Sequence, residues 1–141
     1  MTVIAAPRRI VQILALPGFD TLARFALTSP FLISGIVKLA DFADAVDEVA
    51  GLGLRPAPLI AALVIGTQLG GSALFLVRRT CWLGAGILAG FTVLATLLAH
   101  PFWMFDGPDH GRQTATFFEH VSIVVGLVLG ALLANGRDTR P

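Results

Sequence analysis

The sequence has few charged residues. Asp, Glu, Lys and Arg make up 13% of its 141 residues, whereas roughly a quarter of the residues in an ordinary soluble domain are charged. The ten basic residues are scattered and the net charge is +1, so the chain lacks the basic patch that is typical of nucleic-acid binding. Its length indicates a single domain, residues 1–141.

Cysteine is almost absent as well. The single Cys81 excludes an internal disulfide and any CxxC pair for redox chemistry or metal binding. We interpret it as a small packing residue rather than a reactive thiol. The sequence also contains no nucleotide-binding loop, nucleophile elbow or metalloprotease motif. No catalytic residue is therefore predicted, and the chain is not expected to be an enzyme on its own.

Long apolar runs are abundant. Residues 59–77, LIAALVIGTQLGGSALFLV, carry no formal charge, and at about 1.5 Å per residue such a helix crosses a hydrocarbon core of about 30 Å. Three further segments of similar character are residues 22–40, 81–99 and 117–134. The sequence therefore predicts an all-α membrane protein, a bundle of four transmembrane helices in the lipid bilayer.

The connections between these segments have patterns of their own. Residues 1–18 are expected to form an interfacial segment, with Asp20 or Thr21 capping the first crossing. Residues 41–58 predict a short amphipathic helix on the membrane surface, because apolar residues recur there at helical spacing. These residues are Phe42, Val46, Val49 and Leu52. Residues 100–116 contain the turn-forming run Asp-Gly-Pro-Asp, so we expect a polar loop.

The basic residues predict the orientation of the bundle. Seven of them belong to the side of the two termini and three to the other side. Because Lys and Arg favour the cytoplasmic side, both termini are expected in the cytoplasm and the amphipathic helix outside it. Arg24 and Lys38 are expected to reach the headgroups from opposite ends of the first crossing. The seven are Arg8, Arg9, Arg24, Arg78, Arg79, Arg137 and Arg140.

Small residues predict how the helices pack. In lipid, helices associate through close backbone approach at stripes of small residues. Such stripes fit contacts within the bundle or contacts with a second copy of the chain, so a homo-oligomer is one prediction. They are formed by Gly66 and Gly70, by Gly86 and Gly90, and by Gly126 and Gly130 on the second, third and fourth crossings.

The candidate site residues are polar side chains within or beside the crossings: Lys38, Gln68, His100, Trp103, Glu119 and His120. Four of them, Lys38, His100, Glu119 and His120, come to a similar depth at the ends away from the termini; Trp103 lies just beyond them, and Gln68 lies in mid-membrane. An ionisable group in a membrane segment is costly unless it is satisfied, so these residues are candidates for a ligand or proton site. Interfacial anchoring, a Lys38–Glu119 ion pair and interhelical hydrogen bonding by Gln68 are the alternatives. Two histidines without a third donor do not indicate a metal.

Several of these stretches together resemble the DoxX family. They are FLISGIVKLADF with Ser34-Gly35 and Lys38, then Gly70-Gly71, then His100-x-Phe102-Trp103, and a Gly-rich fourth helix, in order over residues 21–135. Many members carry a glutamate where this chain has Gln68, and a Lys-Asn pair where it has Glu119-His120. The resemblance implies a small four-helix protein of the bacterial inner membrane. Members are similar to the membrane subunit of thiosulfate:quinone oxidoreductase or are linked to thiol and oxidative-stress defence.

Two classes of function stay open. The first is a non-catalytic membrane subunit that anchors a redox protein partner, with quinone as the candidate ligand near His100, Trp103 and His120. The second is a standalone protein for transport of small molecules or lipids, or for envelope maintenance. An intact pocket lined by Lys38, His100 and Glu119 would favour the first. A polar path through Gln68 and Thr96 to the cytoplasmic side would favour transport.

Overall fold

The computed structural model describes residues 6–16 and 18–138, with side-chain environments as far as residue 135. Its regular structure in these ranges is helical. The helices are α1 (Arg8–Leu14), α2 (Phe19–Ala40), α3 (Phe42–Gly51), α4 (Ala57–Leu76), α5 (Cys81–Ala99) and α6 (Gly107–Asp138), with short 3-10 turns at η1 (Arg78–Thr80) and η2 (Phe102–Met104). Among the described residues, four helices are long and apolar enough to cross a membrane, namely α2, α4, α5 and α6. The predicted all-α bundle is confirmed.

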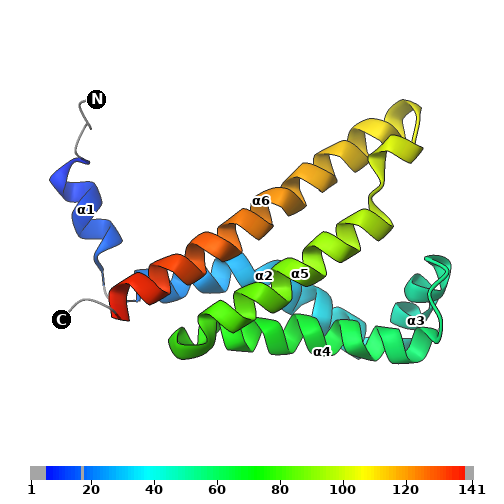
Figure 1. Ribbon diagram of the computed structural model, residues 1–141, viewed down its shortest axis with the longest axis horizontal. Helices are drawn as coiled ribbons and strands as arrows, with labels where there is room; N and C mark the ends of the chain where they lie inside the picture. Colours follow the sequence, from blue (N-terminus) through cyan, green and yellow to red (C-terminus); the bar gives the residue numbers. More distant parts are fainter. Residues whose placement is uncertain (1–5, 17, 139–141) are drawn as a thin grey trace.

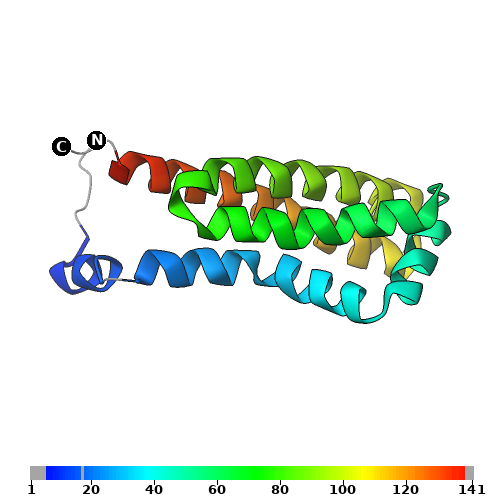
Figure 2. The ribbon, with the colours of Figure 1, turned by 90° about the horizontal axis from the view of Figure 1, so that it is seen from below.

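The four long helices form an elongated bundle with two distinct ends (Figures 1 and 2). α1 and the last turns of α6 lie at one end, here called the terminal end, and α3 lies at the other, the α3 end. α2 packs on α4, α4 on α5, and α5 on α6. α4 and α5 lie together at the terminal end and separate toward the α3 end (Figure 1).

Two local predictions were wrong. α6 begins at Gly107, whose φ is +62°, so most of the expected loop at residues 100–116 is helix. A proline is favourable in the first turn of a helix and an acidic residue complements the helix dipole, so the run Asp-Gly-Pro-Asp starts a helix here. The cap of α2 is Gly18 with a φ of +88° and no side-chain cap hydrogen bond. Asp20 instead forms ion pairs with Arg24 at 3.5 Å and Arg78 at 3.7 Å.

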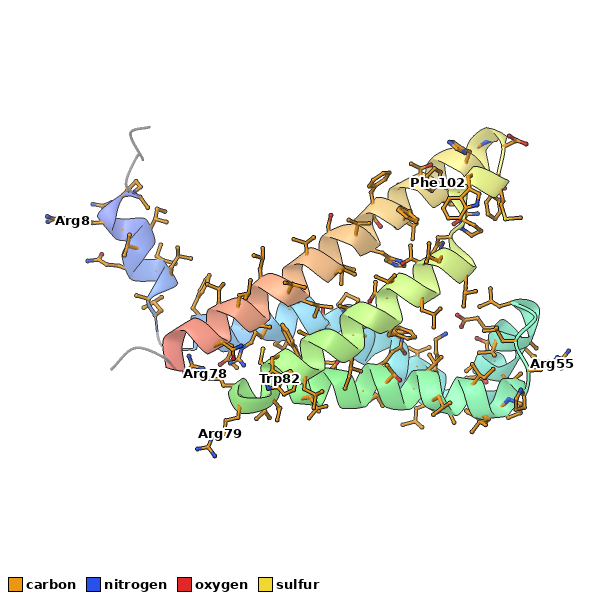
Figure 3. The ribbon with its side chains drawn as sticks, viewed as in Figure 1. Arg8, Arg55, Arg78, Arg79, Trp82 and Phe102 are labelled. Carbon is orange, nitrogen blue, oxygen red and sulfur yellow. The ribbon has the colours of Figure 1, made fainter. Side chains whose placement is uncertain are left out.

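Arg24 is buried rather than directed to the headgroups. Its side chain donates from Nη1 to the carbonyl oxygens of Leu76 at 2.9 Å and Phe75 at 3.4 Å, and the residue is only 6% exposed. The last carbonyls of a helix have no partner within that helix, so Arg24 of α2 satisfies the end of α4. Two more arginines come just after α4 in the chain. Arg78 lies at the terminal end of the bundle, and Arg79 points away from it (Figure 3).

The close contact between α4 and α5 depends on Gly84. A Cβ atom added there would lie 2.3 Å from the backbone nitrogen of Phe75 and 2.7 Å from the carbonyl oxygen of Gly71. At Gly71, an added Cβ would lie 2.8 Å from the Leu88 side chain. Backbone therefore meets backbone at this crossing. The adjoining core at the terminal end is filled by Phe75, Leu88, Leu127 and Cys81, all fully buried.

The predicted glycine stripes have two different environments. Gly126 packs against Leu27 and Gly130 against the Phe75 ring, so these two lie at contacts within the bundle. The four glycines on α4 and α5 are exposed, and an added Cβ would meet no atom within 4 Å at any of them. These are Gly66, Gly70, Gly86 and Gly90. The GxxxG patterns of α4 and α5 therefore do not hold this bundle together.

α3 is the short helix predicted between the first two crossings. Its buried face consists of Ala45 and Val49, which pack against Ala57 and Ala61 of α4, whereas Phe42 and Leu52 are exposed. The helix therefore folds back on the bundle and covers the first turns of α4. Its position outside the membrane stays a prediction.

Candidate functional site

A cavity of about 510 Å³ lies between α2, α3, α4 and α5 in the half of the bundle toward α3. Its lining is mainly apolar, and α6 contributes His120 and Ile123. Leu63, Leu94 and Leu98 line it and are also 44–60% exposed. These leucines therefore border an opening on the lipid-facing side, between α4 and α5.

The deepest polar group of the cavity on α4 is Gln68. This residue is 6% exposed, and its Nε2 donates a hydrogen bond to Ser34 Oγ of α2 at 3.1 Å. Its Oε1 is buried without a hydrogen-bond partner among the described residues. An unsatisfied buried acceptor costs about 1–3 kcal/mol, and this oxygen has less than 1 Å² of accessible surface, so it is enclosed by protein rather than exposed in the cavity.

A histidine pair forms another part of the wall. The rings of His100 and His120 are 5.2 Å apart in an edge-to-face arrangement. His100 Nδ1 lies 2.7 Å from Gln113 Oε1, and His120 Nδ1 lies 2.7 Å from Thr96 Oγ1. Both histidines line the cavity. α5 and α6 thus bring together two imidazoles that are twenty residues apart in the chain.

The orientation of these hydrogen bonds assigns the tautomers. The Thr96 hydroxyl has one proton, which it donates to the Thr92 carbonyl oxygen at 2.6 Å, so His120 Nδ1 must be the donor toward Thr96. His100 Nδ1 likewise donates to the amide oxygen of Gln113. In a neutral imidazole with a protonated Nδ1, the Nε2 atom is an acceptor. Both histidines therefore keep Nε2 available as a hydrogen-bond or proton acceptor.

An ion pair lies at the α3 end of the cavity. Lys38 Nζ of α2 pairs with Glu48 Oε2 of α3, and both residues line the cavity. The predicted pairing of Lys38 with Glu119 is therefore wrong. Because α3 folds back over the bundle, it brings a nearer carboxylate to Lys38. The two formal charges cancel, so the lining is neutral overall when the histidines are neutral.

The structure brings four of the six predicted site residues together and leaves two outside. Lys38, Gln68, His100 and His120 line one cavity. Trp103 is 56% exposed and packs on Phe102 of η2 at 5.2 Å, in the aromatic cluster around Phe102 (Figure 3). Glu119 is also exposed, outside the cavity. Whether any of the six binds a ligand stays a prediction.

Sequence reasoning did not place four supporting residues at this site: Ser34, Glu48 and Gln113 received no role in it, and Thr96 was considered only for a transport path. For Ser34 and Thr96, the spacing along the helix could have indicated their place beside the site. Ser34 precedes Lys38 by four residues and Thr96 precedes His100 by four, so each pair shares a helix face. Among the described residues, no three His, Cys, Asp or Glu side chains converge as metal ligands.

The comparison with known families decides the assignment. The sequence model of the DoxX family matches residues 19–101, more than half of the chain. The chain belongs to the DoxX family. It is similar to inner membrane protein YphA of Escherichia coli (strain K12), with 28% identity over 123 residues that cover 86% of this chain and 87% of that protein. No solved structure matches.

These findings support an integral, multi-pass protein of the inner membrane with the four long helices described above. The matched segment runs from the start of α2 past the end of α5. It therefore contains the four helices that enclose the cavity, together with His100. His120 lies on α6, beyond the matched residues.

Proposed function

We propose that the protein is the membrane subunit of a quinone- or thiol-linked redox system, and that its cavity holds a quinone-type carrier. A protein partner would supply the redox centre. The observation that carries the proposal is the lipid-facing cavity between α4 and α5, with the histidine pair and Gln68 in its lining. Its volume of about 510 Å³ falls within the range of small-molecule sites, about 300–1,000 Å³.

The residues of the cavity fit such a carrier. A bound quinone would supply a lipid-soluble carrier of two electrons and two protons. The leucines at the opening would exclude water. His100 and His120 would each hold a proton at Nε2, since their Nδ1 atoms are already donors. The protein would thus bind the carrier and hold protons while the partner transfers electrons.

A transport role has less support. The lining residues on α4 end at Gln68, and those on α5 begin at Phe91. Beyond them, toward the terminal end, Phe75, Leu88 and Leu127 are fully buried. The cavity is therefore closed at its terminal side, which suits a binding site better than a continuous path across the bilayer.

The proposed orientation places both termini in the cytoplasm and the cavity in the outer half of the bilayer. This follows from the seven-to-three distribution of basic residues. Arg8, Arg78 and Arg79, labelled in Figure 3, belong to the terminal side, whereas Arg55 lies at the α3 end. A homo-oligomer is a further proposal, for which the outward glycines of α4 and α5 offer close approach.

The proposal is tested by photolabelling the purified protein in lipid nanodiscs with an azido-quinone. Labelled peptides should come from residues 60–68 and 91–100, and unlabelled quinone should compete. Ala95→Phe, which narrows the cavity, should abolish this labelling, whereas Ala62→Phe, at an exposed position of α4 outside the lining, should not. Labelling spread evenly over the lipid-facing helices, unaffected by Ala95→Phe, would contradict the proposal. Solute flux into liposomes would then favour transport.

A further inference from the structure

α1 carries apolar side chains that the described part of the chain does not cover. Every residue of this helix is exposed, and its four apolar side chains are each 47–52% exposed. Contiguous exposed apolar surface marks a contact with a membrane or with another protein. The four residues are Ile10, Val11, Ile13 and Leu14.

The sequence of α1 is amphipathic. At about 100° per residue, Arg8, Arg9 and Gln12 fall within an arc of about 100°, and the four apolar residues occupy an arc of about 160° on the other side. Basic residues on one face and apolar residues on the other are typical of a helix that lies in a membrane interface. A helix of 7 residues is also too short to be stable alone in water, so α1 needs a surface on which to pack.

The direction of α1 suits a membrane surface. Its axis runs across the long axis of the bundle (Figures 1 and 2). Because the four long helices cross the bilayer along that long axis, α1 lies in the plane of the membrane rather than through it. Gly18, with a φ of +88°, follows α1 and lets the chain turn into α2.

The charge at the terminal end identifies the kind of headgroup. The charged side chains described at this end are five arginines and one acid, Asp20. Asp20 is already paired with Arg24 and Arg78. An excess of basic groups beside an apolar face attracts anionic lipids, whereas a zwitterionic headgroup has no net charge to offer them. The arginines without an ion pair among the described residues are Arg8, Arg9 and Arg79.

We propose that α1 is an in-plane anchor that binds anionic phospholipids in the leaflet at the terminal end. Its apolar face enters the boundary between headgroups and acyl chains, and Arg8 and Arg9 bind the lipid phosphates. Arg79 lies at the same end of the bundle as Arg8 (Figure 3) and adds to the positive charge there. The anchor is separate from the cavity and does not depend on what the cavity binds.

Fluorescence quenching in liposomes tests the proposal on the full-length protein. A nitrobenzoxadiazole label is attached at Leu14→Cys, on the apolar face, or at Gln12→Cys, on the polar face. The unmutated protein is the blank, because Cys81 is fully buried. Phospholipids brominated on their acyl chains quench a label that touches them. In liposomes that contain phosphatidylglycerol, quenching at residue 14 should exceed quenching at residue 12 severalfold.

Two results would overturn the proposal at this stage. Equal quenching at the two positions would show that α1 does not present one face to the bilayer. A label at residue 14 that emits as in an apolar environment, yet is not quenched by the brominated lipids, would show that protein covers this face.

The headgroup and the arginines are varied next. Quenching at residue 14 should fall severalfold in liposomes of phosphatidylcholine alone, and also at high salt, which screens exposed charges. Joint replacement Arg8→Gln and Arg9→Gln should lower it to the same level in phosphatidylglycerol liposomes. The matched control is Arg55→Gln at the α3 end, which should leave the quenching unchanged.

All of the substituted positions are exposed, so none of the variants disturbs the core. Quenching that is equal with and without phosphatidylglycerol would refute the recognition of anionic lipid and with it the proposal. Quenching that survives the loss of both arginines would refute their role in the same way.

Discussion

Replacing Gly84 with alanine should separate α4 from α5. The new Cβ would lie 2.3 Å from Phe75 N and 2.7 Å from Gly71 O. Ordinary contacts begin at about 3.4 Å, so the helices must move apart by about 1 Å. Overpacking of a well-packed interior costs about 1–3 kcal/mol. The upper end applies here, because both obstructing atoms belong to the backbone and no side-chain rotation can move them.

Gly86→Ala is the matched control on the same helix. An added Cβ at Gly86 meets nothing within 4 Å, so this variant should gain only the helix propensity of alanine, about 1 kcal/mol. Gly84→Ala has the same gain in helix propensity, but its new Cβ also clashes with the backbone of α4. The difference between the two variants in free energy of unfolding should be about 3 kcal/mol, or about a hundredfold in the equilibrium constant.

The assay is unfolding by sodium dodecyl sulfate in mixed micelles, followed by circular dichroism. Gly84→Ala should unfold at a clearly lower detergent fraction than the wild type, and Gly86→Ala at the same or a higher fraction. Equal unfolding of the two variants would refute the backbone contact between α4 and α5, and with it the geometry that opens the cavity.

Three further predictions concern other parts of the bundle. Arg24→Met should lower the free energy of unfolding by about 2–3 kcal/mol in the same assay, because buried carbonyls of α4 lose a charged donor. Its control is Arg79→Met, at an exposed position, which should change the free energy of unfolding by less than about 0.5 kcal/mol. His120→Ala should reduce the competable azido-quinone labelling severalfold, while Glu119→Ala should not, and equal effects would remove the histidine from the site. Reporter fusions at the C-terminus and after Gly53 should report cytoplasmic and external locations respectively, and the same side for both would refute the orientation.

The crossings were predictable because apolar length is a local property of the chain. α5 runs from Cys81 to Ala99, as its apolar run predicts, and α2 and α4 begin two or three residues before their predicted starts. The start of α6 was missed because the same residues that form turns also begin helices. Gly107 with its positive φ permits both.

The site could be predicted only in part, because depth along a helix does not specify direction around it. Lys38 and Glu119 come to a similar depth, yet α3 brings Glu48 to the lysine instead. Similarly, the spacing of Gly66 and Gly70 predicts a helix face without side chains at these positions, but it does not predict what that face contacts. The cavity depends on the angle at which α4 and α5 cross, and this angle is a tertiary property.

The most direct measurement is the identity of the small molecules that the protein retains. Wild type and Ala95→Phe would be purified in parallel in a mild detergent, extracted with organic solvent and compared by mass spectrometry. We expect a quinone or quinol in near-stoichiometric amount in the wild type and its loss in Ala95→Phe, with equal amounts of phospholipid in both. Identical extracts from the two proteins, without a quinone in either, would contradict it.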